Sequence, residues 1–188
     1  TFIIFIIGVT LNRFPFVKWS EGNLAVKPLS QLRILGVLPR IALAYFIASV
    51  LVYYFKKPKI FWIVAAILLG YWLACVLFGI PGDPFSITGY FGTDIDRLIL
   101  GESHMYRGEG IPFDPEGLAS TFTAAVQIII GFLAGQLIIG KSNKPEMLNS
   151  LFFNAALLIF AGFCWNLFFP INKKIWTSSY VVYTTGLA

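Results

Sequence analysis

Long apolar runs alternate with short polar segments along this chain, and the runs have lengths typical of membrane-crossing helices. A helix needs about 20 apolar residues to cross the hydrocarbon core of a bilayer. The runs lie at about residues 1–11, 37–55, 60–80, 115–139, 147–169 and 176–188. They lack the strict alternation of polar and apolar residues that marks the strands of a membrane barrel. The pattern predicts an all-α, polytopic transmembrane helical bundle.

The first and last runs are too short to span a membrane, so we expect about four complete spans plus two truncated ones. The chain starts directly on the apolar sequence TFIIFIIG, without a basic segment of the kind that precedes a signal sequence. We therefore expect a fragment of one larger transmembrane domain, cut within a helix at both ends.

The composition supports a membrane protein and excludes several other classes. Hydrophobic residues make up 57% of the chain and charged residues 12%, against about a quarter charged in soluble domains. The net charge is +5, but the basic residues are scattered over several loops, so we expect no nucleic-acid partner. Cys75 and Cys164 lie inside apolar runs without metal-ligand spacing, and we predict no metal site.

Charge in the short loops predicts an orientation. The loops near residues 56–59 and 141–146 together carry five lysines and one acid. The longer connections on the other side carry more basic residues in total, but long loops are less diagnostic. The positive-inside bias therefore favours the two short loops as cytoplasmic. The polar loop at 81–114 then faces the periplasm or a lumen.

Seven of the nine acids and the only histidine lie in one segment, which we call the acidic segment (residues 80–117). Residues 93–101 are predicted to form a short interfacial helix that ends at Gly101, with Thr93 or Asp94 as its cap. Asp96 and Arg97 are neighbours in sequence and do not face each other on a helix. Each is therefore expected to pair with another group.

The string Asp114-Pro115-Glu116-Gly117 is predicted to start the third complete helix, at 115–139. Asp114 can accept the free N–H groups of a first turn, and Pro115 suits the first helical position. Capping explains Asp114 without any catalytic role. Capping does not explain Glu116 as well, because a helix start does not require a glutamate at this position.

Two further residues suggest chemistry. His104 could be oriented by a nearby carboxylate and deprotonate a hydroxyl or amine; alternatively, it is a loop histidine bonded to the backbone. Arg40, near the start of the run at 37–55, could hold a phosphate or carboxylate bidentately; alternatively, it extends to the interface.

Several strings together resemble one family. They are RILGVLPRIA (33–42), IDRL (95–98), HMY (104–106), FDPEGL (113–118) and PINKKIWTSSYV (170–181). In this order along the chain they resemble the heparan-α-glucosaminide N-acetyltransferase family, including its bacterial relatives of unassigned function. The chain departs from the family at Leu35 and Pro39, where members often have proline and glutamine. The family's proposed catalytic histidine lies in an earlier loop than the part matched here.

The resemblance implies a membrane-embedded acyltransferase that moves an acetyl group from acetyl-CoA, as co-substrate, to an amino sugar or glycan across the membrane. We expect an integral protein of a bacterial inner membrane, in contact with lipid and with residues 81–114 periplasmic. A homo-oligomer is left open. On this topology Lys56, Lys57, Lys59, Lys141 and Lys144 lie on the acetyl-CoA side. The alternatives are a transporter-like or structural membrane module, or a sensor, without catalytic activity; the uncharged centres of the spans argue against transport.

We therefore predict two groups of site residues. The candidate catalytic residues are His104, Glu116 and Asp96. The candidate substrate-binding residues are Arg97, Asp114, Asn172, Lys173, Trp176 and Arg40. Trp176 could stack on a sugar ring, or it could instead be an interfacial anchor.

Overall fold

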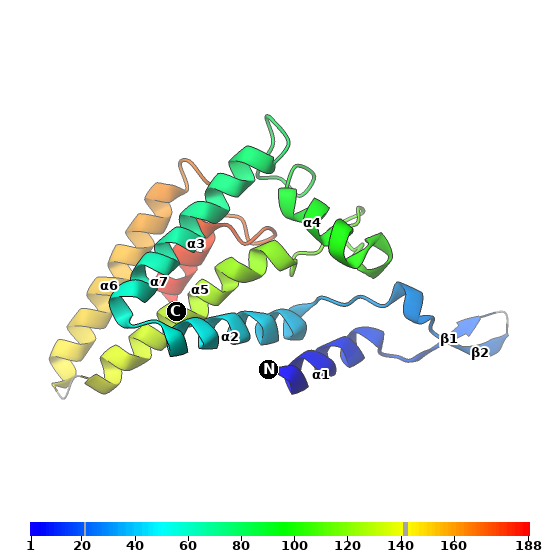
Figure 1. The fold of residues 1–188 in the computed structure, drawn as a ribbon, viewed down its shortest axis with the longest axis horizontal. Helices are drawn as coiled ribbons and strands as arrows, with labels where there is room; N and C mark the ends of the chain where they lie inside the picture. The colour runs from blue at the N-terminus through cyan, green and yellow to red at the C-terminus, as the bar shows by residue number, and fades with distance from the viewer. Residues whose placement is uncertain (21, 141–142) are drawn as a thin grey trace.

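The computed structural model describes residues 1–20, 22–140 and 143–188 and is a bundle of helices with one short β-hairpin (Figure 1). Within these ranges four helices are long and apolar enough to cross a membrane. They are α2 (Val37–Tyr54), α3 (Lys57–Phe78), α5 (Leu118–Gly140) and α6 (Lys144–Trp165). The predicted all-α fold class is confirmed, and the fold is that of an integral membrane protein.

The shorter elements connect and flank these four helices. They are α1 (Phe2–Arg13), β1 (Val17–Ser20), β2 (Asn23–Val26), the 3-10 turn η1 (Leu29–Gln31), α4 (Phe91–Leu100), the 3-10 turn η2 (Glu102–His104) and α7 (Ser178–Leu187). Figure 1 shows α4 at the opposite end of the bundle from the turn between α2 and α3. The acidic segment and the lysine-rich α2–α3 turn are thus separated by the length of the spans.

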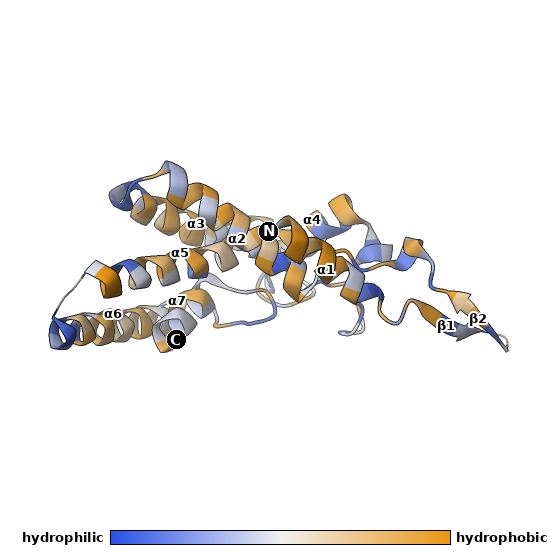
Figure 2. Cartoon of the chain, turned by 90° about the horizontal axis from the view of Figure 1, so that it is seen from below, coloured by the Kyte–Doolittle hydropathy of each residue, from blue (hydrophilic) through white to orange (hydrophobic). Residues whose placement is uncertain are grey.

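The helices of the bundle consist mainly of hydrophobic residues, as the colouring in Figure 2 shows. Large side chains point outward, including Phe152 at 72% exposed and Ile139 at 87%. In water such a surface would drive aggregation. Lipid tails are as apolar as these side chains and can cover them without cost.

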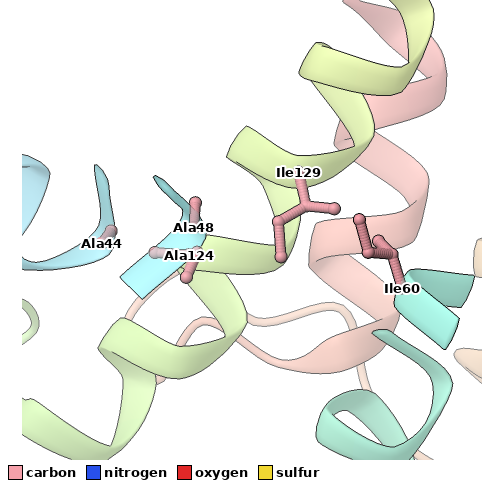
Figure 3. Packing of buried hydrophobic residues seen from close by; sticks show 6 residues of the cluster. Ala44, Ala48, Ile60, Ala124 and Ile129 are labelled. Atoms are coloured by element: carbon pink, nitrogen blue, oxygen red, sulfur yellow. The ribbon is translucent and has the colours of Figure 1, made fainter. Parts of the chain in front are cut away.

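Small residues let the helices approach one another closely. Ala44 and Ala48 of α2 pack against Ala124 and Ile129 of α5 (Figure 3). A Cβ added to Gly162 of α6 would lie 2.6 Å from the backbone nitrogen of Tyr183 in α7. Small residues at helix contacts are typical of membrane bundles, where burial of apolar surface provides no driving force between helices.

Helix boundaries shift by a few residues from those expected. Helix α5 begins at Leu118 rather than Pro115, and α6 ends at Trp165 rather than near 169. Helix α7 begins at Ser178. Thr177 caps it, because its hydroxyl accepts the Tyr180 N–H at 3.4 Å. The connection between α1 and α2 contains the hairpin β1–β2, which we did not predict.

Candidate functional site

Arg33 holds the two carboxylates of the DPEG string. Its Nη2 donates to Asp114 Oδ1 at 2.6 Å and to Glu116 Oε2 at 2.5 Å, while its Nε donates to Asp114 Oδ2 at 3.1 Å. The guanidinium also lies over the Tyr106 ring, 4.6 Å from the ring centroid. Partial burial acts to lower the pKa of Arg33, but Asp114 and Glu116 outweigh it and raise that pKa. Arg33 thus stays charged and fixes both carboxylates.

Asp114 has a different role from the one predicted. Its side chain is fully buried, and Oδ1 accepts the Glu116 N–H at 3.1 Å. The Asp114 carbonyl accepts the Gly117 N–H at 3.0 Å, which closes a turn before the helix begins. The prediction that Asp114 caps α5 is therefore wrong. It orders a turn that presents Glu116, whose side chain is 21% exposed.

The cap of α5 comes instead from Asp96 in α4. Asp96 is buried, and its Oδ1 accepts the Leu118 N–H at 2.9 Å. Its Oδ2 has no hydrogen-bond partner in the described part of the chain. A Cβ on Gly117 would collide with this oxygen, so only glycine lets the carboxyl approach. A carboxylate at a helix N-terminus satisfies a free N–H and complements the helix dipole.

Burial makes Asp96 an unusually weak acid. Desolvation raises its pKa from 3.8 to about 7; the nearby charge of Asp114 adds to the rise, and the Leu118 N–H opposes it. Asp96 therefore exchanges its proton near neutral pH, within the range that suits a general base.

Replacing Asp96 by asparagine is expected to remove a pH dependence of stability. Because the folded-state pKa is raised, the contribution of Asp96 is fully present below about pH 4 and is lost as the pH rises through about 7. Asparagine can still accept the Leu118 N–H and never ionises. Asp96→Asn should thus match the wild type at pH 4 and exceed it above pH 7, by at most about 4 kcal/mol.

Thermal unfolding from pH 4 to pH 8 in detergent tests this expectation. Asp94→Asn is the matched control, because Asp94 lies on the same helix with a side chain that is 76% exposed. Wild-type and Asp96→Asn curves that run parallel across this range would contradict the raised pKa of Asp96.

The start of α4 differs from the prediction, whereas its end agrees. The helix begins at Phe91, after Tyr90, so neither Thr93 nor Asp94 is its cap. It ends at Gly101, whose φ of 82° lies in the region that favours glycine. Arg97 lies on the exposed face and pairs with Asp94 at 2.7 Å and Glu102 at 2.6 Å. Asp96 and Arg97 have separate partners, as predicted, and Arg97 points away from the buried carboxyl.

His104 is held by the backbone of the segment that precedes α2. Its Nδ1 lies 2.6 Å from the carbonyl oxygen of Leu32, and its own carbonyl accepts the Ile34 N–H at 3.3 Å. No hydrogen bond joins it to a carboxylate in the described ranges. A carbonyl only accepts, so Nδ1 carries a proton, and in the neutral form of the ring Nε2 is the acceptor.

Arg40 is buried in the first turns of α2, 6% exposed. Its Nη1 donates to the Pro115 carbonyl at 3.2 Å and its Nη2 to the Ser120 carbonyl at 3.3 Å. The alternative that Arg40 extends to the interface is wrong, and within the described residues Arg40 forms no ion pair with a carboxylate. Its Nε lacks a hydrogen-bond partner there.

Trp176 covers Arg40. The guanidinium lies 3.9 Å from the centroid of the indole, a close cation–π contact. Trp176 Nε1 donates to Gln127 Oε1 at 2.9 Å, and the backbone takes a positive φ of 52°. Thr123 Oγ1 donates to the Trp176 carbonyl at 2.9 Å. The ring is therefore locked within the bundle, and one of its faces is occupied by Arg40.

Asn172 and Lys173 belong to the loop before Trp176. Asn172 Nδ2 donates to the Phe85 carbonyl at 3.1 Å, and its Oδ1 accepts the Lys174 N–H at 2.9 Å. This ties the loop to the acidic segment. Lys173 is exposed, whereas Lys174 pairs with Glu109 at 2.5 Å. Asn172 thus shapes the loop, and Lys173 forms no ion pair in the part of the chain that the structure describes.

Four of the strings that carry the resemblance meet in one polar cluster of buried and partly buried side chains, which we call the Arg33–Arg40 cluster. Its members are Arg33, Arg40, Asp96, Asp114, Glu116 and Trp176. His104 attaches at its edge through Leu32, and Arg97 lies outside it. Within the described ranges no group of three or more histidine, cysteine or acidic side chains could hold a metal ion.

Arg33, Gln127 and Thr123 were missed as site residues. Arg33 bonds to Asp114 across 81 positions of sequence, so no local pattern links them. The sequence did offer one indication of a site role: Arg33 lies in the same string as Arg40, RILGVLPRIA (33–42).

Comparison with known proteins supports the resemblance along the chain. No family model matches the sequence. Mouse heparan-alpha-glucosaminide N-acetyltransferase is 27% identical over 96% of this chain and 34% of its own length. The human protein of the same name is 26% identical over 88% of this chain and 33% of its own length. The chain spans about a third of these curated relatives, and along that third its predicted resemblance to the heparan-alpha-glucosaminide N-acetyltransferases is confirmed.

Proposed function

We propose that the chain is part of a membrane-embedded acetyltransferase, which moves an acetyl group from acetyl-CoA to the amine of an amino sugar or glycan on the other side of the membrane. One observation carries this proposal. The strings that resemble the acetyltransferases are far apart in sequence, yet they supply the Arg33–Arg40 cluster. Packing alone does not require two arginines and three carboxyl groups at one place.

The cluster contains the residue types that the reaction needs. The acceptor nitrogen attacks the thioester carbonyl carbon; a C–N bond forms, the C–S bond breaks, and CoA leaves as its thiolate. The attacking amine must lose a proton to a base. Glu116 is the partly exposed carboxylate, and Nε2 of His104 is a second acceptor for that proton. The Nε–H of Arg40 suits the oxyanion that develops on the carbonyl oxygen.

Asp96 and Asp114 have supporting roles in this proposal. Asp96 fixes the start of α5 and buffers a proton near pH 7. Asp114, held by Arg33, sets the turn that carries Glu116. Lys173 is an exposed cation beside the acceptor end, whereas Arg97 is tied to two surface carboxylates and would act only at the rim.

Acetyl-CoA would approach from the opposite end of the bundle. Lys56, Lys57 and Lys59 are exposed at the α2–α3 turn, and Lys144 is exposed at the start of α6. Lys141 lies outside the described residues. Ammonium groups at a pocket mouth attract the CoA phosphates. The short lysine loops would be cytoplasmic and the acidic segment periplasmic, in a bacterial inner membrane.

An acetyl-transfer assay of the full-length protein tests the proposal. Purified protein is supplied with acetyl-CoA labelled in the acetyl group and with glucosamine, and labelled N-acetylglucosamine is measured. We expect product that depends on both substrates. A folded preparation that binds CoA but transfers no label to any of a panel of amino sugars would overturn the proposal.

A further inference from the structure

The hairpin β1–β2 has one apolar face that is exposed. Val17 pairs with Val26 and Trp19 with Leu24. Because side chains alternate across a strand, these four lie on the same face. They are exposed by 43%, 67%, 71% and 67%, respectively. An exposed apolar patch that contains tryptophan is typical of a segment that rests in a membrane interface.

The other face of the hairpin carries two lysines. Lys18 alternates with Val17 and Trp19, and Lys27 follows Val26 and continues the ladder through its N–H to the Phe16 carbonyl at 2.9 Å. Arg13 Nη2 donates to the Lys27 carbonyl at 3.0 Å. The three cations therefore gather where the last turn of α1 meets the hairpin.

A cavity of about 210 Å³ lies at this place. Its walls are formed by Asn12, Arg13, Lys18, Lys27, Pro28, Gln31 and Leu32. In the described ranges, none of the three basic side chains forms an ion pair with a carboxylate. Arg13 Nε is buried there without a hydrogen-bond partner. Three cations around a cavity favour an anion as the occupant.

We propose that the α1–α2 connection binds an anionic phospholipid, with the phosphate of the headgroup in the cavity of Arg13, Lys18 and Lys27. The apolar hairpin face meets the interface beside it. Two observations point to lipid rather than a soluble anion. Helix α1 is apolar, with Ile3 exposed by 72%, so its Arg13 end lies near a membrane surface. The cavity and the exposed apolar face also belong to the same short hairpin, so one ligand with a charged head and apolar tails satisfies both.

Thermal unfolding of the full-length protein in neutral detergent tests this site. The midpoint is measured with added phosphatidylglycerol, with phosphatidylcholine and with inorganic phosphate. We expect a rise with phosphatidylglycerol alone. Lys18→Gln and Lys27→Gln should each weaken phosphatidylglycerol binding about fivefold, as expected for one basic residue at an anionic surface. Arg107→Gln is the matched control, since it removes an exposed charge from the acidic segment, and it should keep wild-type lipid binding.

The remaining outcomes separate lipid from other occupants. Equal midpoint shifts with inorganic phosphate and phosphatidylglycerol would assign the cavity to a soluble anion and overturn the proposal. Equal shifts with phosphatidylcholine would show that charge is not recognised, and so would unchanged binding in Lys18→Gln and Lys27→Gln. Trp19→Ser, which tests the apolar face, should weaken lipid binding without lowering the lipid-free midpoint. A lower lipid-free midpoint with an unchanged lipid response would assign that face to protein packing instead.

Discussion

Replacing Arg33 by glutamine is expected to lower the free energy of unfolding by about 3–5 kcal/mol, the usual cost of leaving a buried charge without its partner. The Asp114 side chain is fully buried, and Arg33 supplies its only ion pair in the described ranges. The same substitution releases Glu116 from its 2.5 Å contact. The loss should appear as a lower midpoint and a smaller free energy in denaturant unfolding of the purified protein in detergent.

Arg97→Gln is the matched control for Arg33→Gln. Arg97 also contacts two carboxylates, Asp94 and Glu102, but all three side chains are at least 44% exposed. Exposed ion pairs contribute about 0–1 kcal/mol. Adding Asp114→Asn to Arg33→Gln should recover part of the loss, because the unpaired buried charge is then gone. If Arg33→Gln and Arg97→Gln lowered the free energy of unfolding by similar amounts, the Arg33–Asp114 pair would have no special role in stability.

Replacing Glu116 by glutamine is expected to lower kcat about 100-fold or more if Glu116 is the base, the lower end of the range for general acid–base catalysis. This expectation rests on the proposed function. Stability should change little, because Glu116 is partly exposed and Arg33 keeps its two bonds to Asp114. Steady-state acetyl transfer and thermal unfolding of the same preparation give both quantities.

Asp114→Asn supplies the contrast. Asp114 is fully buried and bonded to Arg33 and to the Glu116 N–H, so its loss should lower the unfolding midpoint more than Glu116→Gln does. Its effect on kcat should be smaller and should follow from displacement of the turn. If Asp114→Asn and Glu116→Gln had equally small effects on kcat and lowered the unfolding midpoint equally, both carboxylates would have a structural role and Glu116 would not be the base.

The structural features that depend on local sequence pattern could be predicted. Apolar runs predict helices because every backbone group in lipid must be satisfied within the segment. Helical spacing also predicted that Asp96 and Arg97 have separate partners, which the structure confirms. The hairpin was missed because its strands are only four residues long, within a connection that reads as polar.

Contacts between residues that are far apart in the sequence could not be predicted from local patterns. Asp114 precedes a proline and looks like a cap, but the Leu118 N–H is satisfied by Asp96, 22 positions away. Arg40 looked like a ligand for an anion or a residue that reaches the interface. It does not reach the interface, because the Trp176 ring and two carbonyls, from the DPEG turn and α5, enclose its guanidinium. Such pairings arise only when the chain is folded.

Transfer across a sealed membrane tests the central claim most directly. The full-length protein is reconstituted into vesicles, its orientation is determined, and labelled acetyl-CoA is placed on one side with glucosamine on the other. We predict labelled N-acetylglucosamine on the side of the acidic segment when acetyl-CoA is on the side of the α2–α3 turn, and a large loss of that product with Glu116→Gln. Product that forms only when both substrates share one side, at a rate that Glu116→Gln leaves unchanged, would contradict the account.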